Sequence, residues 1–318
     1  MKEHELSLVT GGGGFIGSHL VEALLARGDR VRIFDNFSTG SKNNLKGMQP
    51  APEIIEADLN DPAAVDHAMQ GVSTVYHLAA LASVARSIET PLVTHQACVT
   101  GTLHVLDAAR RHGVRRLVFS ASSSAYGGRS MEGGQREDMP VMPQSPYAAA
   151  KLAGEMYLQA FAAAYRLECV SLRFFNIFGP RQRSDSPYSG VIALFCDAML
   201  AGRAPVVHGD GLQSRDFTFV ANAVTALLGA GRCPNTSGKV YNVGTGMSIT
   251  LLELIAALNK LLGTRIVPQL GSLRAGDVRH SLANIERARQ DLGYEVQVSF
   301  EEGLSRTLKW YQELGGAN

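Results

Sequence analysis

Short apolar segments alternate with longer amphipathic ones over the first half of the chain. The apolar segments cover Leu6–Val9, Val31–Phe34, Ile54–Ala57, Thr74–Leu78, Leu117–Ser120 and Glu168–Leu172. Between two of them, Thr102–His112 carries Leu103 and Leu106 on one helical stripe and stops at Gly113. Strands separated by helix-length segments need crossover connections, so they form parallel βαβ units. The pattern therefore predicts an α/β fold with a doubly wound parallel sheet.

After about residue 172 the pattern becomes less regular. Glycine and proline are denser there, as in Gly179-Pro180 and Gly209-Asp210-Gly211. Helical patterns return at about Val191–Ala201, Ala221–Ala230, Leu251–Leu262 and Phe300–Leu314. We therefore expect a nucleotide-binding domain over residues 1–172 and a smaller, mainly substrate-binding α/β domain over residues 173–318, with segments that can interleave.

Composition narrows the class of protein. The chain has 318 residues, 45% of them hydrophobic, which is enough to bury a full core. Its 30 Lys and Arg residues balance 29 Asp and Glu residues, so no overall field favours nucleic acid or a membrane surface. No apolar window reaches the roughly 18 residues of a membrane span, and the amino terminus lacks the apolar stretch of a signal peptide. The four cysteines are far apart, so we expect a cytoplasmic protein without disulfides or a metal site.

A glycine-rich turn follows the first strand. Gly11, Gly14 and Gly17 have the spacing GxxGxxG, and an amphipathic helical segment comes next. Glycine permits a tight turn and close approach of a pyrophosphate, which then faces the helix amino terminus. Asp35 ends the second strand, where a carboxylate accepts hydrogen bonds from an adenosine ribose and repels a 2′-phosphate. A flexible loop and a turn-capping aspartate are the alternatives; the context favours a Rossmann-type domain that binds NAD rather than NADP.

Further cofactor contacts are expected in this turn and after the next strands. They are Phe15, Ile16, Asn36, Asp58, Leu59, Leu78, Ala79 and Ala80. For Asp58 the alternative of an ordinary turn residue stays open.

A tyrosine and a lysine share one face of a later helix. Ser145 can cap this helix, and Tyr147 and Lys151 lie four residues apart on it. A phenol has a pKa of about 10, which an ammonium and a positive nicotinamide would both lower, so that Tyr147 becomes a usable acid and base. The hydroxyls of Ser122–Ser124 follow a strand whose carboxyl end should meet the same ligand. Chance spacing and a serine-rich turn are the alternatives.

These motifs together resemble one family. Thr10–Gly17, His77–Ala80, Ser122–Gly127 and the Tyr147-xxx-Lys151 pair are similar to those of the extended short-chain dehydrogenase/reductases that modify nucleotide sugars. The likeness is strongest to UDP-hexose and UDP-N-acetylhexosamine 4-epimerases, and it extends over almost the whole chain.

The resemblance implies catalytic roles. Ser122 would be the catalytic hydroxyl, Tyr147 the base for the proton of the sugar hydroxyl at carbon 4, and Lys151 the residue that holds the nicotinamide ribose and lowers the tyrosine pKa. Hydride would pass from carbon 4 to NAD, giving a transient 4-keto sugar, and return to the opposite face. The product would be the 4-epimer.

The resemblance also implies contacts to the UDP-sugar. They are Ser83, Ser123, Ser124, Asn176, Val191, Arg215, Arg274, Asp277 and Ser281. Two guanidinium groups, Arg215 and Arg274, suit a diphosphate, and the carboxylate of Asp277 suits ribose hydroxyls. Ser281 is similar to a gate position that is small in epimerases that admit an N-acetyl group, so UDP-GlcNAc or a related N-acetylated sugar is expected, with UDP-glucose as the alternative. Ordinary surface residues are the alternative for each.

Two departures and two rival functions stay open. Cys98 stands where the family usually has Asn, and residues 128–132 differ from the usual epimerase continuation. A UDP-sugar dehydratase would act through the same 4-keto intermediate, by 4,6- or 5,6-elimination, but 4,6-dehydratases carry an Asp-Glu pair where this chain has Ser123 and Ser124. A non-catalytic NAD-sensing protein is remote, because Tyr147 and Lys151 are both present. The family likeness further implies a homodimer through paired helices.

Overall fold

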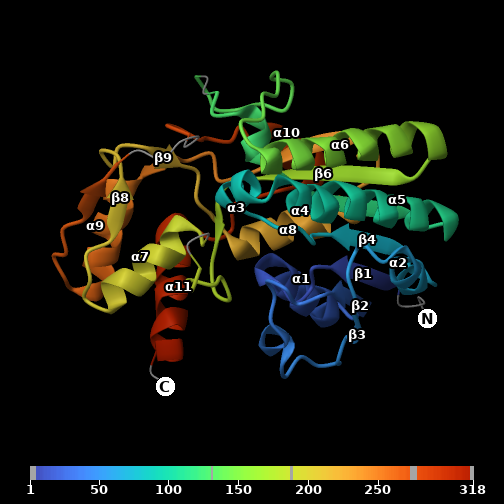
Figure 1. Ribbon diagram of the computed structural model, residues 1–318, viewed down its shortest axis with the longest axis horizontal. Coiled ribbons are helices and arrows are strands. Elements are labelled where there is room, and N and C mark those ends of the chain that lie inside the picture. The colour runs from blue at the N-terminus through green and yellow to red at the C-terminus, as the bar shows by residue number, and fades with distance from the viewer. Residues whose placement is uncertain (1–4, 130–131, 187–188, 273–277, 316–318) are drawn as a thin grey trace.

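The computed structural model describes residues 5–129, 132–186, 189–272 and 278–315 (Figure 1). Seven parallel strands form its central sheet: β1 Leu6–Thr10, β2 Arg30–Asp35, β3 Glu53–Glu56, β4 Thr74–His77, β5 Arg116–Ser122, β6 Glu168–Phe174 and β11 Lys239–Val243. Their order across the sheet is β11-β6-β5-β4-β1-β2-β3. The order reverses between β1 and β4, and ligands of such sheets bind outside the carboxyl ends at this point. The predicted doubly wound parallel sheet is thus confirmed.

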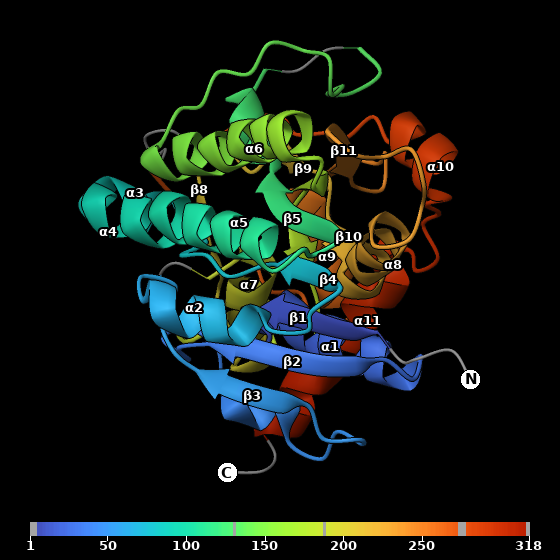
Figure 2. The ribbon, with the colours of Figure 1, turned by 90° about the vertical axis from the view of Figure 1, so that its right-hand side faces the viewer.

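Helices cover both faces of the sheet (Figure 2). One layer contains α2 Pro62–Met69, α5 Gly101–Arg111 and α6 Pro146–Tyr165, and the other contains α1 Phe15–Ala26, α8 Val220–Ala230 and α10 Glu286–Leu292. Neighbouring strand residues therefore point into different cores: Leu117 packs in the α5 and α6 layer, and Val118 in the α1 and α8 layer. Because both faces are covered, β1, β4, β5 and β6 are buried at almost every position rather than at alternate ones, whereas the edge strand β3 is largely exposed.

The segment before α5 is also helical. It consists of α3 Val84–Glu89, α4 Pro91–His95 and a π-helical turn, Gln96–Thr100, which lead into α5. Both ribbon views show this row of helices beside α6 (Figures 1 and 2). Cys98, the sequence departure noted above, lies in the π-helical turn, and such turns are frequent at functional sites.

A second, mainly helical part of the molecule lies beyond the carboxyl ends of the sheet strands. Its helices are α7 Val191–Leu200, α9 Leu251–Leu262 and α11 Phe300–Gly315. They enclose a core in which the Phe178 and Phe300 ring centroids are 6.0 Å apart and those of Phe217 and Phe300 are 5.9 Å apart. Short strands connect this part: β7 Ile177–Phe178, β8 Val206–His208, β9 Ser214–Arg215, β10 Thr218–Phe219, β12 Ile249–Thr250 and β13 Gln269–Gly271.

The second half of the chain also returns to the sheet. β11 pairs in parallel with β6, and α8 packs on α1. The two halves therefore interleave, and the domain boundary at residue 172 stays a prediction. In the described parts of the chain, no helix has both the length and the apolar character needed to cross a membrane. All four cysteines are free.

Candidate active site

One cavity of about 1440 Å³ lies between the carboxyl ends of the sheet strands and α7. Every described residue expected from the sequence to contact cofactor or substrate lines it: Gly11, Gly14, Phe15, Ile16, Gly17, Asp35, Asn36, Asp58, Leu59, Leu78, Ala79, Ala80, Ser83, Ser122, Ser123, Ser124, Tyr147, Lys151, Asn176, Val191, Arg215 and Ser281. Arg274 and Asp277 lie outside the described residues. The fold thus brings together positions that are up to 270 residues apart in the chain.

The glycine-rich turn forms a cradle at one end of the cavity. Gly11 has φ +72°, and a Cβ there would lie 2.8 Å from the Ala79 backbone nitrogen. A Cβ on Gly17 would lie 2.1 Å from the Gly11 carbonyl oxygen. Helix α1 begins beside the turn with Gly14 as its N-cap, and no side chain caps its first-turn N–H groups. Uncapped N–H groups and the positive end of a helix suit an anion, so the turn fits the diphosphate of a dinucleotide.

A fixed carboxylate stands at the end of β2. Asp35 is 8% exposed, and its two oxygens accept hydrogen bonds from the backbone N–H groups of Gly13 and Phe37, each at 2.8 Å. Burial raises the pKa of Asp35, and these two hydrogen bonds oppose the rise. At the end of β3, Asp58 accepts a hydrogen bond from Asn36 at 2.6 Å. Asp35 and Asp58 therefore suit the adenosine part of NAD, which is the contact that the sequence predicts for them.

A buried histidine connects the strands and the helix next to the glycine-rich turn. His77 Nδ1 is 2.7 Å from the Thr10 hydroxyl, and Nε2 is 2.9 Å from the Thr102 hydroxyl, which itself donates to the Cys98 carbonyl at 2.7 Å. Because the Thr102 proton is used on Cys98, Nε2 must be the donor and Nδ1 the acceptor. Burial lowers the pKa of His77 to about 3. This neutral imidazole ties β1 and β4 to the start of α5.

The tyrosine, lysine and serine motifs meet at the middle of the cavity. Ser145 caps α6 as expected, since its Oγ accepts from the backbone N–H three residues later at 3.2 Å. Tyr147 and Lys151 follow on one face of the first two turns. Ser122 lies close enough to Tyr147 for its hydroxyl to lower the pKa of the phenol. The Ser122 hydroxyl accepts from the Ser124 backbone N–H at 3.2 Å and is 2.9 Å from the Ser124 hydroxyl, so its orientation is fixed.

Burial controls the charges of this group. Burial raises the pKa of Tyr147, the nearby Cys98 raises it further, and the Ser122 hydroxyl opposes the rise. Burial lowers the pKa of Lys151, whose Nζ donates to the Ser120 carbonyl at 2.8 Å and lies 4.8 Å from the centroid of the Phe119 ring. The ammonium is thus held by the sheet, and a lowering of the Tyr147 pKa by Lys151 and nicotinamide stays a prediction for the complex with NAD.

The sequence missed the residue that organises the other end of the cavity. Asp216, next to Arg215, is fully buried and accepts five hydrogen bonds, from Thr218, Thr245, Gly246 and Ala283. Burial raises its pKa, and the hydrogen bonds oppose the rise. It fixes the segment around Ser281, which is 7% exposed. A single sequence does not reveal that this aspartate is buried, so only its position next to Arg215 could have drawn attention to it.

Comparison with known proteins agrees with this geometry. Residues 7–244 match the model of the NAD dependent epimerase/dehydratase family. The chain is 38% identical to a UDP-glucose 4-epimerase of Mycolicibacterium smegmatis, over 96% of this chain and 98% of the relative.

Two solved structures extend the comparison. A UDP-N-acetylglucosamine 4-epimerase from Methanobrevibacter ruminantium, in complex with UDP-N-acetylmuramic acid, superposes with a TM-score of 0.93 at 38% identity, covering 99% of this chain and 100% of that one. A UDP-glucose 4-epimerase of Thermus thermophilus, in complex with NAD, superposes with a TM-score of 0.88 at 35% identity, covering 96% and 99%.

The chain belongs to the NAD dependent epimerase/dehydratase family. It is an NAD-dependent enzyme of the nucleotide-sugar epimerase and dehydratase class, which confirms the resemblance and the cofactor expected from the sequence.

Proposed function

We propose that the enzyme is a UDP-sugar 4-epimerase whose substrate is UDP-GlcNAc or a related N-acetylated UDP-sugar. One observation carries the proposal: Ser122 and Tyr147 line the same cavity as the dinucleotide cradle, with Lys151 one turn further along α6. Acid and base groups for a sugar hydroxyl thus adjoin the place for a hydride acceptor.

The residues of the chain divide the work at carbon 4. Bound NAD supplies reversible hydride acceptance from this carbon. Tyr147 takes the proton of the 4-hydroxyl and returns it after the hydride comes back to the opposite face, so no net redox change occurs. Ser122 holds the oxygen at carbon 4 and donates to the phenolate. Lys151, with its Nζ anchored on Ser120, places a positive charge near the ribose of the cofactor.

The sugar end supports an N-acetylated substrate. Ser281 lines the cavity with a small side chain and is held by its own N–H, which donates to the Ser214 carbonyl at 3.1 Å. A small residue at the family's gate position leaves room for an acetamido group. Asn176 and Arg215 line the same end and suit the diphosphate. The related structure in complex with UDP-N-acetylmuramic acid also supports the proposal of an N-acetylated substrate.

A dehydratase is the second candidate, because it needs the same oxidation at carbon 4. Elimination also needs a group that moves a proton at carbon 5, and in ordinary 4,6-dehydratases carboxyl groups follow the catalytic hydroxyl. Among the described residues that line the cavity, the carboxylates are Asp35, Asp58 and Asp197, two at the adenosine end and one on α7. Ser123 and Ser124 supply hydroxyls only, which favours the epimerase.

Product analysis with a matched variant tests the proposal. Purified protein with NAD and UDP-GlcNAc should give the 4-epimer by NMR, and Tyr147→Phe should lower kcat by at least about 100-fold, because acid and base catalysis is lost. NAD binding to the variant should persist. A vinylic or 4-keto product would support the dehydratase, and unchanged turnover of the variant would contradict the role of Tyr147.

We further propose the homodimer implied by the family likeness. Leu92 and Val93 on α4, and Met156 and Tyr157 on α6, are exposed apolar side chains on helices that lie side by side. Their burial against a second copy would form the paired-helix interface. Helix α6 also packs on β5 and β6 through its other face.

A further inference from the structure

A buried glutamine lies a few residues after the segment 128–132, in which the sequence departs from the epimerase pattern. Gln135 is 2% exposed and forms a parallel bridge with Ala283. Ala283 comes two residues after Ser281, so the bridge joins the chain around Gln135 to the segment around Ser281. Neither the motifs nor the mechanism assigns a role to Gln135.

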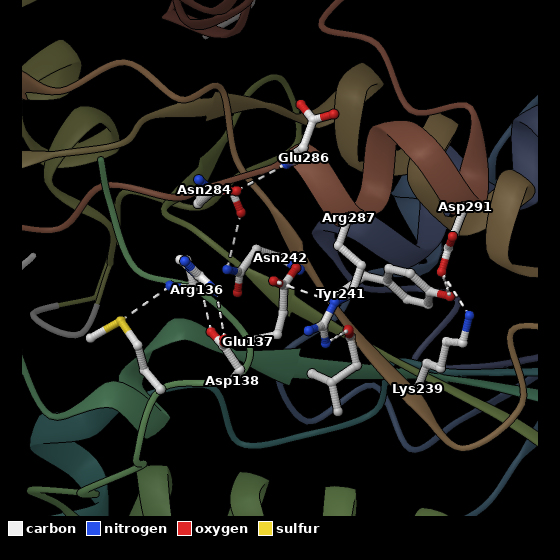
Figure 3. Close-up of polar contacts among 12 residues, drawn as sticks. Arg136, Glu137, Asp138, Lys239, Tyr241, Asn242, Asn284, Glu286, Arg287 and Asp291 are labelled. Atoms are coloured by element: carbon white, nitrogen blue, oxygen red, sulfur yellow. Dashed lines mark hydrogen bonds and ion pairs between the residues drawn. The ribbon is translucent and has the colours of Figure 1, made fainter. Parts of the chain in front are cut away.

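Three hydrogen bonds fix the backbone of Gln135. Its N–H donates to the Leu282 carbonyl at 2.7 Å, and its carbonyl accepts from the Asn284 N–H at 2.9 Å and from Asn242 Nδ2 at 2.8 Å. Asn242 is itself held by two hydrogen bonds (Figure 3). The backbone N–H of Asn242 donates to Glu137 at 2.8 Å, and the side-chain Nδ2 of Asn242 also donates to the Asn284 carbonyl. The position of Gln135 is therefore set by several elements at once.

The side-chain amide of Gln135 is also oriented. Nε2 donates to the Arg129 carbonyl at 2.7 Å, and a flipped amide would place two oxygens against each other there. Oε1 is thus the remaining atom, and it is buried with no hydrogen-bond donor among the residues that the structure describes. An unpaired buried acceptor is costly, so such atoms usually have a partner.

Gln135 lines the cavity together with the sugar-end residues. Ser123, Ser124, Val278 and Ser281 line the same cavity. Because Gln135 itself is one of the lining residues, we infer that a donor for Oε1 reaches it from the cavity side. Because Oε1 only accepts, the partner must carry a hydroxyl or an amide N–H.

We propose that Gln135 is a specificity-determining residue whose Oε1 accepts a hydrogen bond from a donor on the sugar ring, a hydroxyl or the N–H of an acetamido group. The inference deepens the proposed function and rests on the substrate being a UDP-sugar. A sugar that presents an ionised carboxylate at this place has no proton to donate, so Gln135 also disfavours uronic acids there.

Binding to a panel of sugars tests the assignment. The complete UDP-GlcNAc is compared with UDP-sugars in which one donor, at carbon 2, 3 or 6, is replaced by hydrogen or fluorine. NAD-loaded Tyr147→Phe protein serves as the background, so that affinity is measured without turnover. We expect one replacement to weaken binding by about 5- to 100-fold, because Oε1 is then left unpaired. If none of the three replacements matters, the proposal is overturned.

A variant at Gln135, combined with the sugar analogues, completes a double-mutant cycle. Gln135→Met has a similar shape and no acceptor, so it should weaken binding of the complete sugar by a similar factor and cause no further loss with the one analogue that lacks the donor. An equal loss with every member of the panel would instead indicate a structural role and overturn the proposal.

Gln213 offers a matched control. It is 4% exposed, its Nε2 donates to the His208 carbonyl at 2.6 Å, and its Oε1 also lacks a donor among the described residues. It lines the cavity close to Arg215 in the chain. Because Arg215 suits the diphosphate that every sugar of the panel shares, Gln213→Met should change affinity equally for all of them. If no UDP-sugar binds even the protein with both glutamines intact, the proposed function fails. This result differs from the one in which UDP-sugars bind but none of the replacements on the sugar changes the affinity.

Discussion

The two ends of the cavity are built in different ways. At the cofactor end, the cradle comes from one continuous turn, and its contacts are largely backbone atoms of Gly11–Gly17 with Asp35 beside them. At the sugar end, side chains from several distant segments meet, and Asp216 and Asn242 hold them through hydrogen bonds. A diphosphate needs only N–H groups and space, whereas recognition of one sugar needs placed side chains.

This difference explains where change is tolerated. A backbone cradle leaves no space for added atoms, so its tolerance is limited by steric contact. A side-chain network loses specific hydrogen bonds when one member changes, and its neighbours then remain buried without partners. Substitutions at the two ends should therefore fail for different reasons and affect different ligands.

The largest effect is expected at the cofactor end. Gly17→Ala places a Cβ 2.1 Å from the Gly11 carbonyl oxygen, a backbone atom that cannot move aside cheaply. We expect loss of NAD binding, measured by cofactor titration, and a fall of about 3 kcal/mol or more in the free energy of unfolding. Gly271→Ala is the control, because its Cβ would lie an ordinary 3.4 Å from a His208 side-chain atom. Normal NAD affinity in Gly17→Ala would refute the backbone account.

A smaller effect, on the other ligand, is expected for Asp216→Asn. Each carboxylate oxygen of Asp216 accepts from at least two donors, so an amide NH₂ must face N–H groups whichever way it is turned. We expect a loss of about 1–3 kcal/mol in denaturant unfolding and a raised KM for the UDP-sugar with unchanged NAD affinity.

Asp210→Asn provides the matched control for this substitution. It removes the same charge from an exposed ion pair with Arg279, where solvent screens the interaction and the loss of stability should be clearly smaller than for Asp216→Asn. Equal losses in the two variants would show that burial of Asp216 does not matter.

The smallest effect concerns the side chain beneath the cradle. His77 has a folded-state pKa of about 3, whereas an unfolded histidine titrates near 6.5. Between these values the unfolded chain binds a proton that the folded chain does not, so stability present above pH 6.5 is lost as the pH falls, by about 1.4 kcal/mol per pH unit. His77→Gln should flatten the curve of unfolding free energy against pH between 6 and 4 by this slope. Parallel curves would argue against a neutral buried imidazole.

Much of the cofactor end could be predicted because its signals are local. The turn at Gly11–Gly17, the strand before it and the helix after it occupy adjacent positions, and the cap at Ser145 is likewise local. Asp216 and Gln135 could not be found in this way. Their roles depend on burial and on partners such as Ala283, which lies 67 residues from Asp216. The contact of Lys151 Nζ with the Ser120 carbonyl was similarly beyond the sequence, because it joins different elements of the fold.

The alternation of strands and helices, the glycine cradle and the pairing of Tyr147 with Lys151 could be read from the sequence, because hydrophobic period, helix capping and glycine conformation act over a few neighbouring residues. The tertiary structure was needed to show which side chains are buried, that Asp216 anchors the segment around Ser281, and that the Oε1 atom of Gln135 has no donor among the described residues. Hydrogen-bond partners and desolvation depend on which segments lie close together in the folded protein. Positions along the chain do not reveal which distant segments come into contact.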